Sequence, residues 1–107
     1  MRELEQIKKL AVLHCVFQTI ASAEGGIDEE RDFEAISFAL SELGLNSIYS
    51  WDAALKLDPH DSFIHIATFS DNDKPKFREL LLAVANMGGN VEVKKTCAQH
   101  LFQLCYL

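Results

Sequence analysis

Apolar residues recur over the first part of the chain at the spacing of a buried helix. Between residues 3 and about 22 the stripe comprises Ile7, Leu10, Leu13, Phe17 and Ile20, widened by Val12, Cys15 and Val16. A helix at the surface needs only one apolar face, and this stripe is wider than that. We therefore predict a central helix that is buried on more than one side and is ended by Gly25 and Gly26.

A second helix is expected to start at Asp28, whose carboxylate is a good N-terminal cap. Glu29 and Glu30 follow in the first turn, where the helix dipole favours negative charge. Gly44 stands where a C-terminal cap belongs. The apolar residues that this helix is expected to turn inward are Phe33, Ile36, Leu40 and Leu43.

The middle of the chain is predicted to hold two short helices. The first, over residues 47–57, contains the single tryptophan, Trp51. The second has a start signal in Asp58 as the cap and Pro59 at the first helical position. Residues 62–69 are rich in aromatic and β-branched side chains, as strands are. No other segment offers this stretch a pairing partner, so we expect a helix there too.

Two further helices are expected after a turn at residues 70–73. The first matches the full helical template with Phe77, Leu80, Leu81, Val84 and Ala85. Gly88 and Gly89 end it, and the last helix begins near Val91. The residues expected on its inner side are Cys97, Ala98, Leu101, Leu104 and Cys105. We predict one all-α domain over residues 1–107, a bundle of five to six helices without linkers.

Composition restricts the classes of function. The chain has 107 residues, is 49% hydrophobic and carries a net charge of −6. An acidic chain repels phosphate backbones, and no basic stripe with interleaved aromatic residues is present. No run approaches the ~18 apolar residues that a membrane span needs. We expect no nucleic-acid binding, no membrane span and no cofactor.

The N-terminal region has one feature of a signal peptide. Lys8 and Lys9 precede an apolar run that ends in small residues at positions 21–23. Two glutamates before the run and three polar residues within it argue against secretion. They are Glu3, Glu5, His14, Gln18 and Thr19. The odd number of cysteines, three, fits a reducing compartment, so we expect a cytoplasmic protein.

Two helix–Gly-Gly–helix hairpins stand at opposite ends of the chain. A shift of 64 residues superimposes Ala21 on Ala85, Gly25 on Gly89, Ile27 on Val91 and Leu40 on Leu104. Glycine suits such a break because it accepts a positive φ without a Cβ clash. The apolar residue two positions later is expected to point inward. The structural motif predicted for both hairpins is Gly25, Gly26, Ile27, Gly88, Gly89 and Val91.

This layout resembles the tellurite-resistance TerB family and its relatives, which include the helical domain fused to some DnaJ-type co-chaperones. The family hallmark is Ala-x-Asp-Gly-x-(Ile/Val), with a Glu four residues later, in two copies. Here the first copy is Ala23-Glu24-Gly25-Gly26-Ile27, followed by Asp28-Glu29-Glu30-Arg31, and the second is residues 86–95. The resemblance covers nearly the whole chain in layout and rests on few residues. It implies an all-α, two-repeat fold.

The departures from this family bear on metal binding. In the family the acidic positions are thought to form a divalent-metal site. Here the Asp positions are Glu24 and Gly88, and the Glu positions are Arg31 and Lys95. A hard cation needs several converging oxygens and little positive charge nearby. We expect that the metal site is lost, and that Gly25, Gly89 and their neighbours serve folding.

The acidic cluster of the chain has two interpretations. Its members are Glu24, Asp28, Glu29, Glu30, Asp32 and Glu34. An EF-hand register fails, because it places Ile20 and Ser22 at the first ligand positions and Arg31 at the last. We interpret the cluster as a solvated helix start; the alternative is a metal site at Glu24, Asp28 and Glu30.

Histidine and cysteine residues give no catalytic motif. His14, His60, His65 and His100 lack HxxxH and HExxH spacing. His14 and His100 are expected to be satisfied or half-buried, and Cys15, Cys97 and Cys105 to pack as small hydrophobes. Gly-x-Ser-x-Gly, Walker and dinucleotide motifs are lacking. We expect a non-enzyme; the alternative is a small enzyme that uses His14 or His100 beside a thiol.

The function predicted from the sequence is therefore a TerB-like module that binds a protein partner or a second copy of itself. Tyr106 and Leu107 follow the last helix without a polar tail and are candidates for an interface. The alternative is a divalent-metal-binding protein of the tellurite-resistance type.

Overall fold

The computed structural model describes residues 1–45 and 48–105, with the backbone alone at Ile48. In these ranges it contains six helices and no strand. They are α1 (Gln6–Ala21), α2 (Glu29–Glu42), α3 (Ile48–Leu55), α4 (Pro59–Ala67), α5 (Asp73–Ala85) and α6 (Val91–Leu104). The predicted all-α bundle is confirmed. The strand-like stretch at residues 62–69 forms most of α4, and Thr68 and Phe69 lie just past its end.

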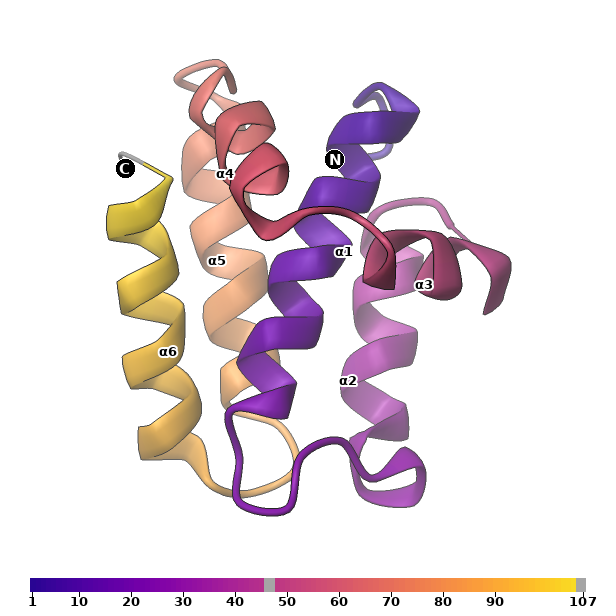
Figure 1. Ribbon diagram of the computed structural model, residues 1–107, viewed down its shortest axis with the longest axis vertical. Helices are drawn as coiled ribbons and strands as arrows, with labels where there is room; N and C mark the ends of the chain where they lie inside the picture. The colour runs from indigo at the N-terminus through magenta and orange to yellow at the C-terminus, as the bar shows by residue number, and fades with distance from the viewer. Residues whose placement is uncertain (46–47, 106–107) are drawn as a thin grey trace.

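The first helix, α1, lies at the centre of the bundle (Figure 1) and packs against all five other helices. Its buried residues run without a break from Ala11 to Val16 and continue at Thr19 and Ile20. Thr19 is tolerated there because its hydroxyl donates to the carbonyl oxygen of Cys15 at 2.9 Å. The expectation of a helix buried on more than one side is confirmed.

The start and stop signals in the sequence work as expected. An Oδ1 atom of Asp28 accepts from the backbone N–H groups of Glu30 and Arg31, both at 3.0 Å. Asp58 caps α4 in the same way. At the end of α2, Gly44 has a φ of +70°, and the N–H of Leu45 reaches back to the carbonyl of Leu40 at 2.8 Å. That bond marks a Schellman C-terminus, which fixes where the chain leaves α2.

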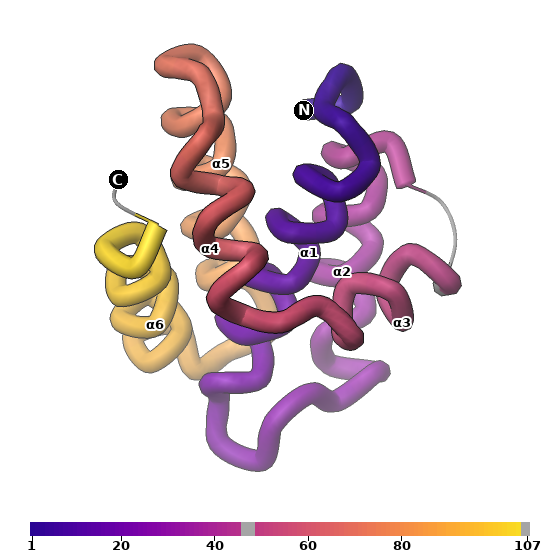
Figure 2. Tube along the Cα trace, turned by 45° about the horizontal axis from the view of Figure 1, so that its top comes forward, coloured from indigo at the N-terminus to yellow at the C-terminus, as the bar shows by residue number. Residues whose placement is uncertain are grey.

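The two Gly-Gly loops, which connect α1 to α2 and α5 to α6, lie at the same end of the bundle, below the helices in Figure 1. Figure 2 shows the same loops from another angle. Gly25 and Gly26 have φ angles of +86° and +73°, and Gly88 and Gly89 have +80° and +87°. All four glycines therefore adopt backbone conformations that side chains with a Cβ avoid. Ile27 packs against the core, and Val91 is half-buried at the first position of α6.

The 64-residue offset holds for the first helix of each hairpin and fails for the second. α1 and α5 end at Ala21 and Ala85, which are 64 residues apart. α2 and α6 begin at Glu29 and Val91, which are only 62 apart, because the second loop is two residues shorter. Counted from the helix starts, Leu40 therefore corresponds to Phe102, and its predicted match to Leu104 is wrong.

The inner face of α2 differs from the predicted one. The buried residues of the helix are Asp32, Ala35 and Ala39, with Leu43 at its C-terminal cap. Phe33, expected to point inward, is 69% exposed, and Ile36 and Leu40 are only partly buried. The helix is rotated relative to the prediction, and its small alanines let it pack closely against the core.

A smaller correction applies to α6. Leu104 was expected on its inner side but is 46% exposed, whereas Phe102 is buried. The Phe102 ring packs edge-on against Phe77 of α5, with ring centres 6.0 Å apart. An aromatic pair of this geometry fills the space between the two helices.

Candidate functional site

The two glycine loops meet at a buried carboxylate. Asp32 lies in the first turn of α2 with 1% of its surface exposed. Its Oδ2 atom accepts from the backbone N–H of Asp28 at 2.9 Å and from the Arg31 guanidinium at 2.8 Å, and its Oδ1 atom accepts from Arg31 Nε at 3.1 Å. Burial alone would raise the pKa of Asp32, but these hydrogen bonds and the charges of Arg31 and Lys94 outweigh it and lower that pKa.

The cation that faces this carboxylate from the other hairpin is Lys94, which is also buried. Its ammonium group donates to the carbonyl oxygen of Met87 in the α5–α6 loop. Burial lowers the pKa of Lys94, the charge of Asp32 opposes that shift, and the charge of Arg31 adds to it. Arg31 in turn donates to the carbonyl of Gly26 at 2.7 Å, so each loop is held by a basic side chain of the following helix.

Gly88 permits this close contact between the loops. A Cβ atom at that position would lie 3.1 Å from Asp32 Oδ1 and 3.3 Å from the Arg31 carbonyl oxygen. At Gly89, by contrast, a Cβ would meet nothing within 4 Å. The loop junction of Arg31, Asp32, Gly88 and Lys94 therefore fixes the rotation of α2. With Asp32 turned inward, Phe33 is 100° further round the helix and faces outward.

The alternative metal site is not assembled at this junction. Glu24 and Glu30 are exposed, and Asp28 is used as the cap of α2. Across the described residues, no three side chains of His, Cys, Asp or Glu are grouped so that they could hold a metal ion. The positive charge that neutralises the buried carboxylate comes from Arg31 and Lys94.

His14 is satisfied within the core, as expected. Its Nδ1 atom lies 2.9 Å from the carbonyl oxygen of Ala54 at the end of α3, and its Nε2 atom lies 2.8 Å from Gln18 Nε2. A neutral ring that donates through Nδ1 and accepts through Nε2 satisfies both contacts. The expectation for His100 is wrong, because this residue is exposed on α6.

The thiols come together in a way that their spacing in the sequence did not reveal. Cys15 of α1 and Cys105 at the end of α6 are both fully buried. Contact with the Cys105 thiol, reinforced by burial, raises the pKa of Cys15. Burial also raises the pKa of Cys97, whose Sγ atom lies 3.6 Å from the carbonyl oxygen of Gln18. Contact with the Cys15 thiol in turn lowers the pKa of Cys105. Cys15 and Cys105 belong to the core and Cys97 is half-buried against it, as expected for packing.

The outer side of α2, which we call the α2 strip, carries a large exposed apolar side chain, Phe33. Phe33, Ser37, Leu40 and Ser41 follow the i, i+4, i+7, i+8 spacing of one helix face. Beyond Phe33 this face is hollowed. The hollow measures about 430 Å³ and is lined by Arg2, Ser37, Leu40, Ser41, Gly44 and Leu45. A bulky apolar side chain therefore projects beside a depression on the same face.

Charges flank the α2 strip unevenly. Glu29, Glu30 and Glu34 are exposed around Phe33, and none of them forms an ion pair within the described part of the chain. At the other end, the Arg2 guanidinium donates to the carbonyl oxygen of Ser41 at 3.2 Å. The strip thus has an acidic end beside its projecting ring and a basic end beside its hollow.

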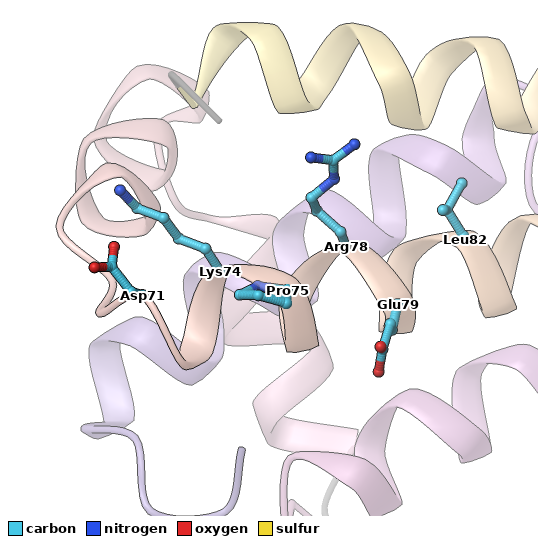
Figure 3. Close-up of a pocket in the computed structure, with 6 residues that line it drawn as sticks. All are labelled: Asp71, Lys74, Pro75, Arg78, Glu79 and Leu82. Atoms are coloured by element: carbon cyan, nitrogen blue, oxygen red, sulfur yellow. The ribbon is translucent and has the colours of Figure 1, made fainter.

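A second hollow, of about 460 Å³, lies along the outer side of α5 and the turn before it (Figure 3). It is lined by Asp71, Lys74, Pro75, Arg78, Glu79 and Leu82. Arg78 points toward α6, where its guanidinium lies 5.0 Å from the centre of the Phe102 ring. Because two acidic and two basic residues balance each other here, this hollow offers no charge by which to select a ligand.

Comparison with known proteins adds no assignment to these features. No protein-family model, no curated protein and no solved structure matches the chain. No helix in the described ranges is long and apolar enough to cross a membrane. Tyr106 and Leu107, the interface candidates from the sequence, lie outside the described residues. The α2 strip, which sequence reasoning missed as a surface, is the candidate site that remains.

Proposed function

We propose that this chain is a non-catalytic, TerB-like helical module that works by binding another polypeptide through the α2 strip. The observation that carries the proposal is the exposure of Phe33, 69% of whose surface faces solvent. Aromatic rings contribute strongly to protein interfaces because they bury a large rigid surface at small entropic cost. Ile36 and Leu40 extend the apolar surface along the same helix.

The balance of burial within α2 supports this proposal. The helix buries a carboxylate and two alanines, Asp32, Ala35 and Ala39, and leaves one of its two phenylalanines, Phe33, largely exposed. Burying an aromatic side chain stabilises a protein by about 2 kcal/mol relative to exposure. The isolated chain does not gain this stabilisation, because Phe33 is exposed. The complex gains it when a partner buries Phe33.

The positions of His14 and of the two fully buried thiols support a non-catalytic role. Both ring nitrogens of His14 are engaged inside the core, and Cys15 and Cys105 are buried. An acid–base or nucleophilic group must reach its substrate, and these groups do not face solvent. The resemblance to the TerB family adds a proposed stress-related setting for such a binding module.

Photo-cross-linking in cells tests this proposal. A photoreactive amino acid is introduced in place of Glu34, which flanks the α2 strip, and as a control in place of Asp61, which is exposed on α4. We expect a discrete adduct with a polypeptide from position 34 alone, and its loss when Phe33 is also changed to Ser. Equal adducts from both positions, or none from position 34, would refute the α2 strip as a binding surface.

A further inference from the structure

We infer that the partner on the α2 strip is a second copy of this chain, in an antiparallel two-fold pairing of α2 helices. This inference rests on the proposed function and specifies its occupant. It is motivated by self-complementarity, since the strip carries both a projecting ring, Phe33, and a hollow about one to three turns further along. A surface of this kind can pair with itself across a two-fold axis.

The register of the pairing follows from the positions of the ring and the hollow. If the axis passes beside Ser37, then Phe33, four residues before it, faces Ser41, four residues after it, in the other copy. Ser41 lines the hollow of about 430 Å³. A cavity of about 150 Å³ accommodates benzene, so the hollow has room for the phenyl ring. Symmetry inserts both rings at once.

The charges match in the same register. Glu30, seven residues before Ser37, faces Gly44, seven residues after it. Arg2 covers Gly44, because its Cγ atom lies 3.1 Å from where a Cβ of that glycine would be. The acidic end of each strip therefore meets the basic end of the other, and two Glu30–Arg2 pairs form per dimer. A parallel pairing would instead bring the glutamates of both copies together, which costs free energy.

The test is the association of the purified 107-residue chain, measured by sedimentation velocity over a range of concentrations. We expect a monomer–dimer equilibrium in the wild type. Phe33→Ser should weaken it about a thousand-fold, because an anchoring aromatic is worth about 2 kcal/mol and is lost twice per dimer, about 4 kcal/mol in all. Val93→Ser, a change at an exposed apolar residue of α6, is the matched control and should leave association unchanged.

Charge exchange tests the antiparallel register itself. Arg2→Glu and Glu30→Lys each place like charges together in a homodimer, so each should weaken association about ten-fold. An equimolar mixture of the two variants should restore it, because the mixed dimer has opposite charges at both contacts. Circular dichroism confirms that each variant is folded.

Three outcomes would overturn the inference: a monomer at every concentration, a dimer that Phe33→Ser does not weaken, or a charge-exchanged mixture that is no stronger than its components. If the chain is monomeric while cross-linking from position 34 still captures a different polypeptide, the proposed function holds and the second copy is refuted. Loss of both results would refute the proposed function as well.

Discussion

Asp32 and Lys94 occupy the same place in their helices and carry opposite charges. Each is four residues after the N-cap of its helix, Asp28 for α2 and Asn90 for α6, and each is buried. Their charges interact where the two glycine loops meet. Asp32 also packs against Gly88 of the other hairpin, and with Asp32 facing the core, Phe33 faces solvent.

Removing both charges of this pair should destabilise the protein less than the sum of the two single removals. Asp32→Asn leaves Lys94 and Arg31 without their carboxylate and should lower the free energy of unfolding by about 3 kcal/mol. The double variant Asp32→Asn/Lys94→Met should recover at least about 1 kcal/mol of the loss expected from the summed single variants. Urea unfolding measures all four proteins. Strict additivity would show that the two residues do not interact.

The lowered pKa of Asp32 predicts a specific acid sensitivity. Its carboxyl has a pKa below the ordinary value of 3.8, so between the folded and unfolded values the unfolded chain binds more protons. The stability supplied by ionised Asp32 is therefore complete at neutral pH and is lost as the pH falls below 3.8 through the folded value. The difference in unfolding free energy between wild type and Asp32→Asn should shrink from pH 7 toward pH 3. A constant difference would mean that the pKa is not lowered.

Alanine substitutions at two adjacent glycines distinguish the cost of backbone strain from the cost of a clash between the loops. Gly88 and Gly89 have similar positive φ angles, +80° and +87°, so alanine at either position costs about 1–2 kcal/mol of strain. Gly88→Ala also places a Cβ 3.1 Å from Asp32 Oδ1, whereas the space at Gly89 is open. Thermal melting should show Gly88→Ala as the more destabilising change by at least about 1 kcal/mol. Equal effects would show that the close contact between the loops does not contribute to stability.

Residue patterns predicted the helices well because their ends depend on local chemistry. The residues that start and stop the helices act through hydrogen bonds and φ angles within a few positions, so they can be recognised in the sequence. They include Asp28, Asp58 with Pro59, and Gly44. The central burial of α1 was also predictable, because its apolar stripe is too wide for a surface helix.

The rotation of α2 was not predictable in this way. Periodicity favours Phe33 over Asp32 as an inward residue, since an isolated carboxylate is costly to bury. Asp32 nevertheless faces the core in place of Phe33, and its partners there, Lys94 and Gly88, lie more than fifty residues away in sequence. The contact of Cys15 with Cys105 was hidden for the same reason.

Divalent metal ions are expected to leave the stability unchanged. The buried carboxylate already has two cationic neighbours, and Asp28 is engaged as a helix cap. A ligand at one hundred times its dissociation constant adds about 2.7 kcal/mol, which raises the melting temperature of a domain this size by roughly ten degrees. Melting scans with millimolar calcium, magnesium, manganese or zinc, against a chelator, give the readout. A chelator-reversible rise that disappears in Glu24→Ala would restore the metal alternative.

The central claim is that Phe33 belongs to an interface and not to the core. The most direct test is the free energy of unfolding of wild type and Phe33→Ser, measured over a wide range of protein concentration. We predict that the two agree within about 0.5 kcal/mol in dilute solution, and that only the wild type gains stability as concentration rises. A loss of about 3 kcal/mol or more in Phe33→Ser at every concentration, as for a buried phenylalanine, would contradict the account.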